Sequence, residues 1–388
     1  MTLNLLAAAA TNAPADLKMW AYVGFIGLVF IFLALDLGVF HRDAHEVSMK
    51  ESLIWSAIWL TCGLSFSVFV YFAYEHHWLA LGLNTPKYVD GAIALGEVTG
   101  ATAAIQYLTG YVVEKSLAMD NIFVIAMIFG FFAIPAKYQH RVLFWGIIGA
   151  LVMRGGMIFL GAELIMRYTW ILIFFGVFLI LTALKMALIK SHDDPGNNVV
   201  VKLAKRMFRT VDFFDGQKFF TRRTVAPTYI RDPISGKDVY APAEPGTLSA
   251  KSAATPLFLA LIMVEVTDLV FAVDSIPAIF AITPDPFIVF TSNIFAILGL
   301  RALYFCLAAL IAKFRFLKPA LILILAFVGV KLLLLAAPPY FYDFGWSASE
   351  VKSIKIDPMI SLVIVLVTLV LASVLSIVFP AKESEEKK

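Results

Sequence analysis

The chain carries one acidic pattern twice. In each copy a carboxylate is followed six positions later by Asp, and then directly by a small polar residue and Ile. The carboxylates are Glu114 and Asp120 in the first copy, and Asp268 and Asp274 in the second. Both copies lie inside apolar runs long enough to cross a bilayer, where ionisable side chains are costly and usually serve a function. The pattern therefore predicts a functional site inside a membrane.

Three further polar residues extend this candidate site. Glu265 precedes Asp268 by three positions, so both carboxylates face one side of a helix. Asn121 can contribute an amide oxygen, and Asp36 adds an acid in another apolar segment, unless it is an interfacial carboxylate. Oxygen ligands suit Mn²⁺, Mg²⁺ or Ca²⁺, and the apolar segments hold no His or Cys cluster for Zn²⁺ or Cu⁺. The predicted metal ligands are Asp36, Glu114, Asp120, Asn121, Glu265, Asp268 and Asp274.

The second copy of the pattern contains a proline that the first copy lacks. Pro277 releases the carbonyl of Val273 from helical hydrogen bonding and bends the chain. In a regular helix Asp268 and Asp274 point about 240° apart, so they share a face only where the helix is distorted. We therefore expect the second copy to hold an ion more tightly than the first.

Each acidic copy is followed by basic residues in the same order. Arg154 and then Lys185 follow the first copy, while Arg301 and then Lys331 follow the second. The six intramembrane acids exceed these four basic residues by two, a difference that one dication would close unless some carboxylates are protonated. We expect Arg154 and Arg301 to be the counter-ions of the acids. The alternative is a purely structural ion-pair network.

The elements that position these residues are expected to be membrane-spanning helices. Of the 388 residues, 61% are apolar and only 15% are charged, which exceeds the apolar share of roughly 45–50% in soluble domains. The sequence predicts an all-α polytopic membrane protein with about nine spans. The spans are expected at 19–40, 53–74, 99–134, 141–162, 169–189, 256–281, 287–311, 318–337 and 358–379. The third is too long for one upright crossing, so it must be tilted, broken or double.

The order of acid, Arg and Lys indicates an internal repeat of three spans. Because each unit has an odd number of spans, the two units run in opposite directions, as in many secondary transporters. We expect a two-helix segment at 1–98, the first repeat at 99–189, a cytoplasmic loop at 190–252, the second repeat at 253–337, and a last span with a cytoplasmic tail at 338–388. Basic residues gather in the loops on one side, which predicts an outside N-terminus and a cytoplasmic C-terminus.

The same basic residues bear on partners and on redox chemistry. A net charge of +3 is explained by membrane topology, so we expect no nucleic acid as a partner. The expected partners are the lipid bilayer, the metal ion and protons. The sequence does not identify a protein partner, and a partner-binding role for the central loop stays an alternative to a plain linker. Cys62 and Cys306 lie in separate apolar segments without a CxxC spacing, which argues against a dithiol redox motif.

Four stretches resemble the TerC family of membrane proteins, most closely its Alx-type members. They run from Leu33 to Arg42, from Glu114 to Asn121, from Glu265 to Ala278, and from Thr291 to Arg301. The resemblance implies a protein of the bacterial inner membrane linked to manganese efflux and, for the founding members, to tellurium resistance. It also places the family's acidic positions on the six acids named above. The 222–252 part of the central loop is longer than the family pattern.

These observations together predict a secondary transporter and not an enzyme. It would export a divalent cation, most simply Mn²⁺, in exchange for protons at a midplane carboxylate site. The metal would be the substrate, and no permanently bound cofactor is expected. The alternative is a membrane-bound redox modulator that transports nothing, or a scaffold associated with tellurium resistance or metalation.

Overall fold

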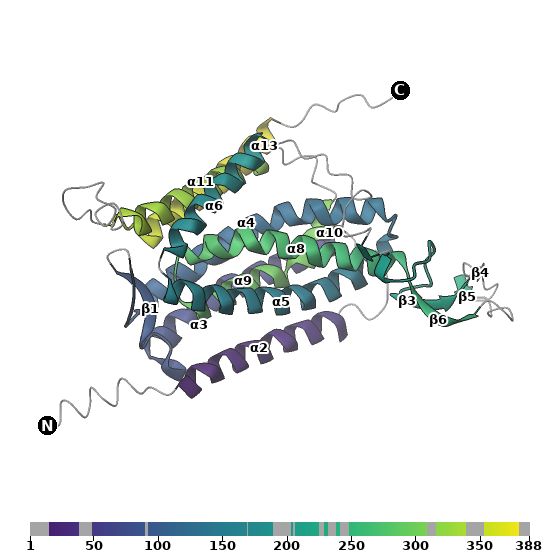
Figure 1. The fold of residues 1–388 in the computed structure, drawn as a ribbon, viewed down its shortest axis with the longest axis horizontal. Helices are drawn as coiled ribbons and strands as arrows, with labels where there is room; N and C mark the ends of the chain where they lie inside the picture. The colour runs from purple at the N-terminus through teal and green to yellow at the C-terminus, as the bar shows by residue number, and fades with distance from the viewer. Residues whose placement is uncertain are drawn as a thin grey trace.

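The fold is a bundle of long helices with three small antiparallel sheets outside it (Figure 1). The structure is a computed structural model. It describes residues 15–38, 49–89, 92–168, 170–188, 203–204, 206–224, 229–231, 238–240, 248–308, 316–338 and 353–379. The helices are α2 (Ala15–Gly38), α3 (Met49–Glu75), η1 (Trp78–Ala80), α4 (Gly100–Phe131), α5 (Ala136–Arg167), α6 (Ile171–Leu188), α8 (Pro256–Phe280), α9 (Pro286–Leu298), α10 (Leu300–Ala308), α11 (Leu317–Ala336) and α13 (Pro358–Val378).

The sheets are short and contain two strands each. Strand β1 (Thr85–Val89) pairs with β2 (Ala92–Gly96), β3 (Phe220–Arg223) with β6 (Leu248–Ala254), and β4 (Tyr229–Arg231) with β5 (Asp238–Tyr240). The last two pairs belong to the predicted loop at 190–252 and its junction with α8. The boundaries predicted for the segments and repeats stay predictions.

The prediction of an all-α polytopic membrane protein is confirmed. Among the described residues, eight helical segments are long and apolar enough to cross a membrane. Helix α4 is not among them; its sequence carries three charged residues, Glu114, Lys115 and Asp120, within seven positions. It fills the place of the third predicted span as one unbroken helix of 32 residues, about 48 Å long. A helix of that length must tilt or extend beyond a core of about 30 Å.

Local sequence explains where several of these helices begin. The Thr99 hydroxyl accepts a hydrogen bond from the Thr102 backbone N–H at the start of α4. Asp285 and Asp357 cap α9 and α13 in the same way, and each is followed by proline at the first helical position. An N-cap acceptor satisfies a backbone donor that the helix leaves free, and proline fits there because its missing donor is not needed.

The two repeats pack as an antiparallel pair. Gly110 of α4 faces Ile279 of α8, whereas Asn121, further along α4, hydrogen-bonds Asp268, which comes earlier in α8. The neighbours of this pair are exchanged between repeats, because α5 packs on α8 while its counterpart α9 packs on α4. Helices α6 and α11 also pack together, outside the central pair. This arrangement is the one that an inverted repeat of three spans requires.

Helix α9 lies at the centre of the bundle. Every residue from Phe287 to Leu298 is buried. The helix ends there, and Gly299 separates it from α10, so the seventh predicted span is divided in two. A side chain at Gly299 would lie 2.7 Å from Cβ of Trp59 and 3.0 Å from Nζ of Lys115, so only glycine fits at this close approach.

Candidate functional site

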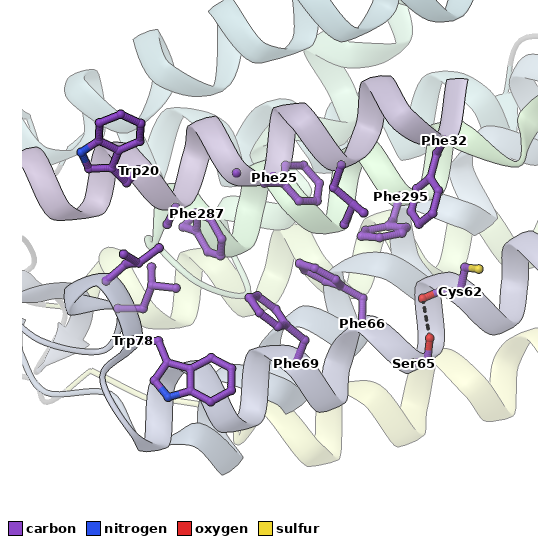
Figure 2. Close-up of a pocket in the computed structure, with 15 residues that line it drawn as sticks. Trp20, Phe25, Phe32, Cys62, Ser65, Phe66, Phe69, Trp78, Phe287 and Phe295 are labelled. Carbon is purple, nitrogen blue, oxygen red and sulfur yellow. Dashed lines mark hydrogen bonds between the residues drawn. The ribbon is translucent and has the colours of Figure 1, made fainter. Parts of the chain in front are cut away.

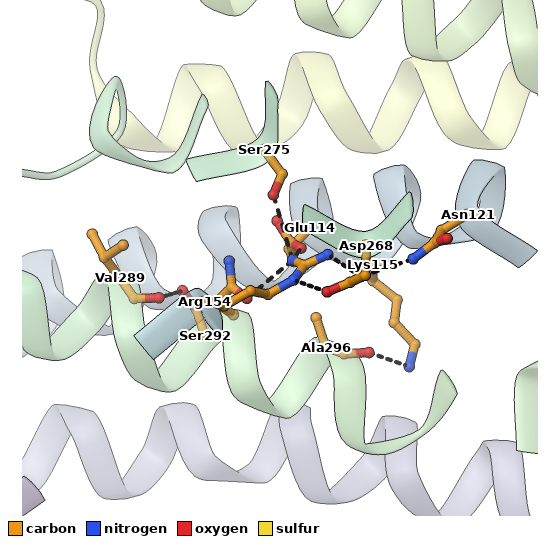
Figure 3. A network of polar contacts seen from close by, with 10 residues as sticks. Glu114, Lys115, Asn121, Arg154, Asp268, Ser275, Val289, Ser292 and Ala296 are labelled. Atoms are coloured by element: carbon orange, nitrogen blue, oxygen red, sulfur yellow. Dashed lines mark hydrogen bonds and ion pairs between the residues drawn. The ribbon is translucent and has the colours of Figure 1, made fainter. Parts of the chain in front are cut away.

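The candidate site is centred on Arg154, near the middle of α5. Its side chain is 2% exposed, and the guanidinium bonds carboxylates from both repeats (Figure 3). Nε and Nη2 donate to the two oxygens of Asp268 at 3.0 and 2.8 Å, and Nη1 donates to Glu114. The fork of the guanidinium matches a carboxylate in this bidentate geometry, which makes the pair strong and directional. Arg154 is therefore a counter-ion of the acids, as the sequence predicts.

Three uncharged polar residues complete the network around this ion pair. The Asn121 amide donates to Asp268 at 2.9 Å, as expected for a residue of the predicted site. The other two, Ser275 and Asn293, accept from Nη1 of Arg154 at 3.4 and 3.1 Å. Neither belongs to the predicted ligand set. Ser275 had a signal in the sequence, because it occupies the place in the second pattern that Asn121 occupies in the first.

Several buried atoms of the network lack a hydrogen-bond partner among the described residues. They are Oε2 of Glu114, Oδ1 of Asn121 and Nδ2 of Asn293. Most buried polar atoms in proteins are paired, so unpaired ones call for an explanation such as a water or ion. Two of these three atoms are oxygens, which are the ligands that a hard cation prefers. The network thus has coordinating capacity beyond what Arg154 uses.

A small cavity adjoins the network. Its volume is about 20 Å³, and Asn121, Asp268 and Arg301 line it together with apolar side chains of α4, α5, α8, α9 and α10. A space of this size holds about one water molecule. Arg301 is buried beside it, which places both predicted arginines at the centre of the bundle.

Glu265 lies against the neighbouring helix. A Cβ atom on Gly149 of α5 would fall 1.9 Å from Oε1 of Glu265, so glycine makes room for this carboxyl group. Its other oxygen, Oε2, is buried and has no hydrogen-bond partner among the described residues. Glu265 is therefore a second carboxylate on α8 with an unused oxygen, one helical turn before Asp268.

The remaining three predicted ligands lie outside the described side chains. Asp36, Asp120 and Asp274 are carried by α2, α4 and α8, and their predicted roles stay predictions. Helix α8 continues as one helix through Pro277. Among the residues that the structure describes, no group of three or more His, Cys, Asp or Glu side chains is placed to hold a metal ion.

Lys115 joins the site to the break in the central span. Its Nζ donates to the carbonyl of Ala296 at 3.0 Å, in the last turn of α9 (Figure 3). The last carbonyls of a helix lack intrahelical partners and carry partial negative charge, so a cation stabilises them. The sequence prediction did not include Lys115, because nothing in the sequence shows that α9 ends at this depth.

One further buried acid lies at the start of α9, outside the spans. Asp285 accepts hydrogen bonds from the Tyr74 hydroxyl at 2.5 Å and from the Phe287 backbone N–H at 2.9 Å. Burial raises the pKa of its carboxyl group above the ordinary value of 3.8. Both of its oxygens are bonded, so its described role is to cap α9.

Comparison with known proteins identifies the family. The model of the integral membrane protein TerC family matches residues 99–384. The chain belongs to the TerC family. Its TerC relatives include a protein of Escherichia coli strain K12 with the provisional name membrane-bound redox modulator Alx. That protein is 42% identical over 327 residues, which cover 83% of this chain and 88% of the relative.

Two other relatives have nearly the same sequence identity. A Photorhabdus laumondii protein with the same provisional name is 42% identical over 351 residues. These cover 90% of this chain and 95% of the length of the relative. An uncharacterized membrane protein of Myxococcus xanthus, STKORF319, is 43% identical over 315 residues, covering 81% and 82%. No solved structure matches the chain.

Proposed function

We propose that this TerC protein is a secondary transporter that exports a divalent metal cation, with manganese as the metal we favour, in exchange for protons. The observation that carries the proposal is the meeting of Glu114 and Asp268, from two antiparallel helices, at one buried point. Inverted repeats place substrate sites near the membrane midplane in many secondary transporters. Buried oxygen atoms without partners, on Glu114, Asn121 and Glu265, would serve as ligands.

Arg154 has a specific part in this proposal. Its guanidinium contacts both Glu114 and Asp268, so a dication bound by these two groups would compete with the guanidinium for the same carboxylates. We propose that Arg154 is a tethered cation that neutralises the empty site and moves aside when metal enters. After the metal leaves, the carboxylates would bind protons or pair with Arg154 again. The empty protein could then return to its starting conformation without an unpaired buried negative charge.

The experiment is a flux measurement in liposomes. With a proton gradient imposed, liposomes that contain wild-type protein in the inside-out orientation should take up Mn²⁺. This uptake should be lost in Asp120→Asn and in Asp274→Asn. Glu163→Gln is the matched control, because Glu163 is an exposed acid on α5 outside the network. Wild-type flux no faster than that of empty liposomes would sink the transporter proposal.

The name of the relatives supports a second candidate, a membrane-bound redox modulator. Within the described residues both cysteines are free, with Cys62 on α3 and Cys306 on α10. A redox role through thiols predicts that Cys62→Ser with Cys306→Ser abolishes function in cells, whereas the transporter proposal predicts unchanged Mn²⁺ flux. Measuring flux for the double variant separates the two candidates.

We place the protein in the bacterial inner membrane, with the N-terminus outside and both the C-terminus and the 190–252 loop in the cytoplasm. The bias of basic residues supports this orientation. A C-terminal green fluorescent protein fusion should fluoresce, and a C-terminal alkaline phosphatase fusion should be inactive. The reverse result would invert the orientation.

A further inference from the structure

A large apolar groove lies between α2 and α3 (Figure 2). Its volume is about 650 Å³. Aromatic rings of α2 and α3, such as Phe25 and Phe66, form its walls, and Phe287 and Phe295 of the central helix α9 form its floor. The one hydroxyl in the lining, on Ser65, already donates to the Cys62 carbonyl at 3.0 Å. Apart from the Cys62 thiol and the indole N–H groups of Trp20 and Trp78, the lining side chains therefore offer a ligand apolar contacts.

A groove of this kind has to be filled. Protein interiors are packed as densely as organic crystals, and an apolar cavity of about 150 Å³ stays dry and takes up small hydrocarbons. This groove has more than four times that volume and lies in the range of about 300–1,000 Å³ typical of ligand sites. Both of its walls are predicted membrane spans, so the molecules at hand to fill it are lipids.

The dimensions of the groove match one lipid chain. Along α2 it extends from Trp20 to Phe32, which is about 18 Å of helix. One leaflet of a bilayer is about 15 Å deep, half of the hydrocarbon core of about 30 Å. The groove is thus as long as an acyl chain that enters from one face of the membrane and reaches the midplane.

One end of the groove has the features of a membrane interface. Trp20 and Trp78 line that end and are 60% and 48% exposed. Tryptophan side chains are enriched at the level of the lipid headgroups. Lys18 lies two residues before Trp20, and its Nζ donates to the carbonyls of Leu83 and Asn84, just beyond the lining residue Leu81. It therefore places a cation near this end of the groove, and it also interacts with Asp285. A positive charge at this place suits the phosphate of a headgroup.

We infer that this groove binds one phospholipid, with an acyl chain between α2 and α3 and its phosphate beside Lys18. The lipid would complete the packing of α2, which contacts the bundle through rings, such as Phe25 on Phe66, and through the buried aliphatic side chains of Val29 and Leu33. The floor residue Phe295 follows Asn293 of the polar network by two positions. This inference does not depend on the proposed transport function.

Two glycines of α2 provide a matched test. A Cβ atom on Gly24 or on Gly27 would meet no atom within 4 Å, but only Gly24 lines the groove. A Cβ atom is therefore accommodated at both positions, and phenylalanine has a higher helix propensity than glycine at both, while only the ring of Gly24→Phe starts from the lining of the groove. Native mass spectrometry of the full chain should show one retained phospholipid in wild type and in Gly27→Phe, and at least a tenfold lower retained fraction in Gly24→Phe.

Cys62 lines the groove, so the rate at which it is labelled gives a second measurement. This measurement does not require the Gly24→Phe variant. In a Cys306→Ala background, added phospholipid should slow the reaction of Cys62 with an apolar maleimide about tenfold. The inference is overturned if wild type and Gly24→Phe retain phospholipid equally, or if added phospholipid leaves the labelling rate unchanged. It is also overturned if Gly24→Phe converts a lipid-free dimer into a monomer, because a second copy would then be the occupant.

Discussion

The two repeats place equivalent carboxylates in unequal surroundings. Asp268 of α8 accepts two bonds from Arg154 and one from Asn121, whereas Glu114 of α4 accepts from one nitrogen of Arg154 and keeps Oε2 without a partner in the described region. Arg154 comes from the first repeat, yet its bidentate contact is with the second. One arginine therefore turns a duplicated acidic pattern into an asymmetric site.

The uncharged residues of the network keep the symmetry that Arg154 breaks. Asn121 of the first repeat bonds Asp268 of the second, and Ser275 of the second shares Nη1 of Arg154 with Glu114 of the first. Each acid thus lies close to the small polar residue of the opposite copy. The antiparallel pair of α4 and α8 therefore brings the acids together. Arg154 then sets which acid accepts more hydrogen bonds.

Replacing Arg154 should have the largest effect on the two acids and on the stability of the protein. Arg154→Gln leaves two buried carboxylates without their counter-ion, so we expect a loss of about 3–5 kcal/mol in the free energy of unfolding. Arg167→Gln is the control, because Arg167 is exposed at the end of the same helix, and it should change stability by about 0.5 kcal/mol or less. Chemical unfolding in detergent measures both.

Added metal sharpens this prediction. If the guanidinium and the cation compete, Mn²⁺ should stabilise Arg154→Gln more than wild type, because a ligand of the folded state adds more stability the more tightly it binds. Equal stabilisation by Mn²⁺ in both proteins would contradict the role of Arg154 as a tethered cation.

Neutralising the two acids one at a time should reveal their inequality. Asp268→Asn loses one more charge-assisted hydrogen bond than Glu114→Gln, so it should be the less stable by about 1.5–3 kcal/mol. The sequence also predicts that the second copy holds an ion more tightly, so Asp268→Asn should weaken Mn²⁺ binding more, as isothermal titration calorimetry measures. Equal losses would mean that the asymmetry around Arg154 has no energetic weight.

Glu265 is a second difference between the repeats, because the equivalent position in the first repeat is Tyr111. Gly149→Ala should displace its carboxyl group and cost about 1–3 kcal/mol. Gly156→Ala on the same helix meets no atom within 4 Å and should be neutral or slightly stabilising. Thermal unfolding of the pair checks this, and identical melting temperatures would show that Glu265 does not need this space.

The middle helices of the two repeats differ in their caps, and this should give the smallest effect. Asp285 caps α9, whereas α5 begins after Pro135 without a side-chain cap. Because burial raises the pKa of Asp285 above 3.8, the folded protein holds this proton more tightly than the unfolded chain. The contribution of Asp285 to stability is therefore greatest below 3.8 and declines as the pH rises through the folded pKa.

Asp285→Asn keeps a side chain that caps helices well but removes the titration. The stability of wild type relative to this variant should fall as the pH rises above 3.8, as melting temperatures over a series of pH values measure. A constant difference at all pH values would show that Asp285 does not titrate differently in the folded protein.

Much of the site follows from sequence because membranes restrict what a span can contain. Long apolar runs predicted every helix in which the site residues lie, and the rarity of acids in such runs singled out Glu114, Asp268 and Glu265. The order of acid, Arg and Lys predicted opposed repeats. Ser275 and Asn293 could not be placed with the same clarity, because hydroxyl and amide side chains are common between packed membrane helices.

The sequence by itself determined the fold class, the order of acid, Arg and Lys in each half, and the acids of the site, since hydropathy and spacing are properties of one segment at a time. Only the tertiary structure decided that two nitrogens of Arg154 donate hydrogen bonds to Asp268, that Lys115 caps the end of α9, and that Gly299 divides the seventh span. These features depend on the rotation and depth of helices far apart in the chain. Packing between helices sets both, and no single segment encodes it.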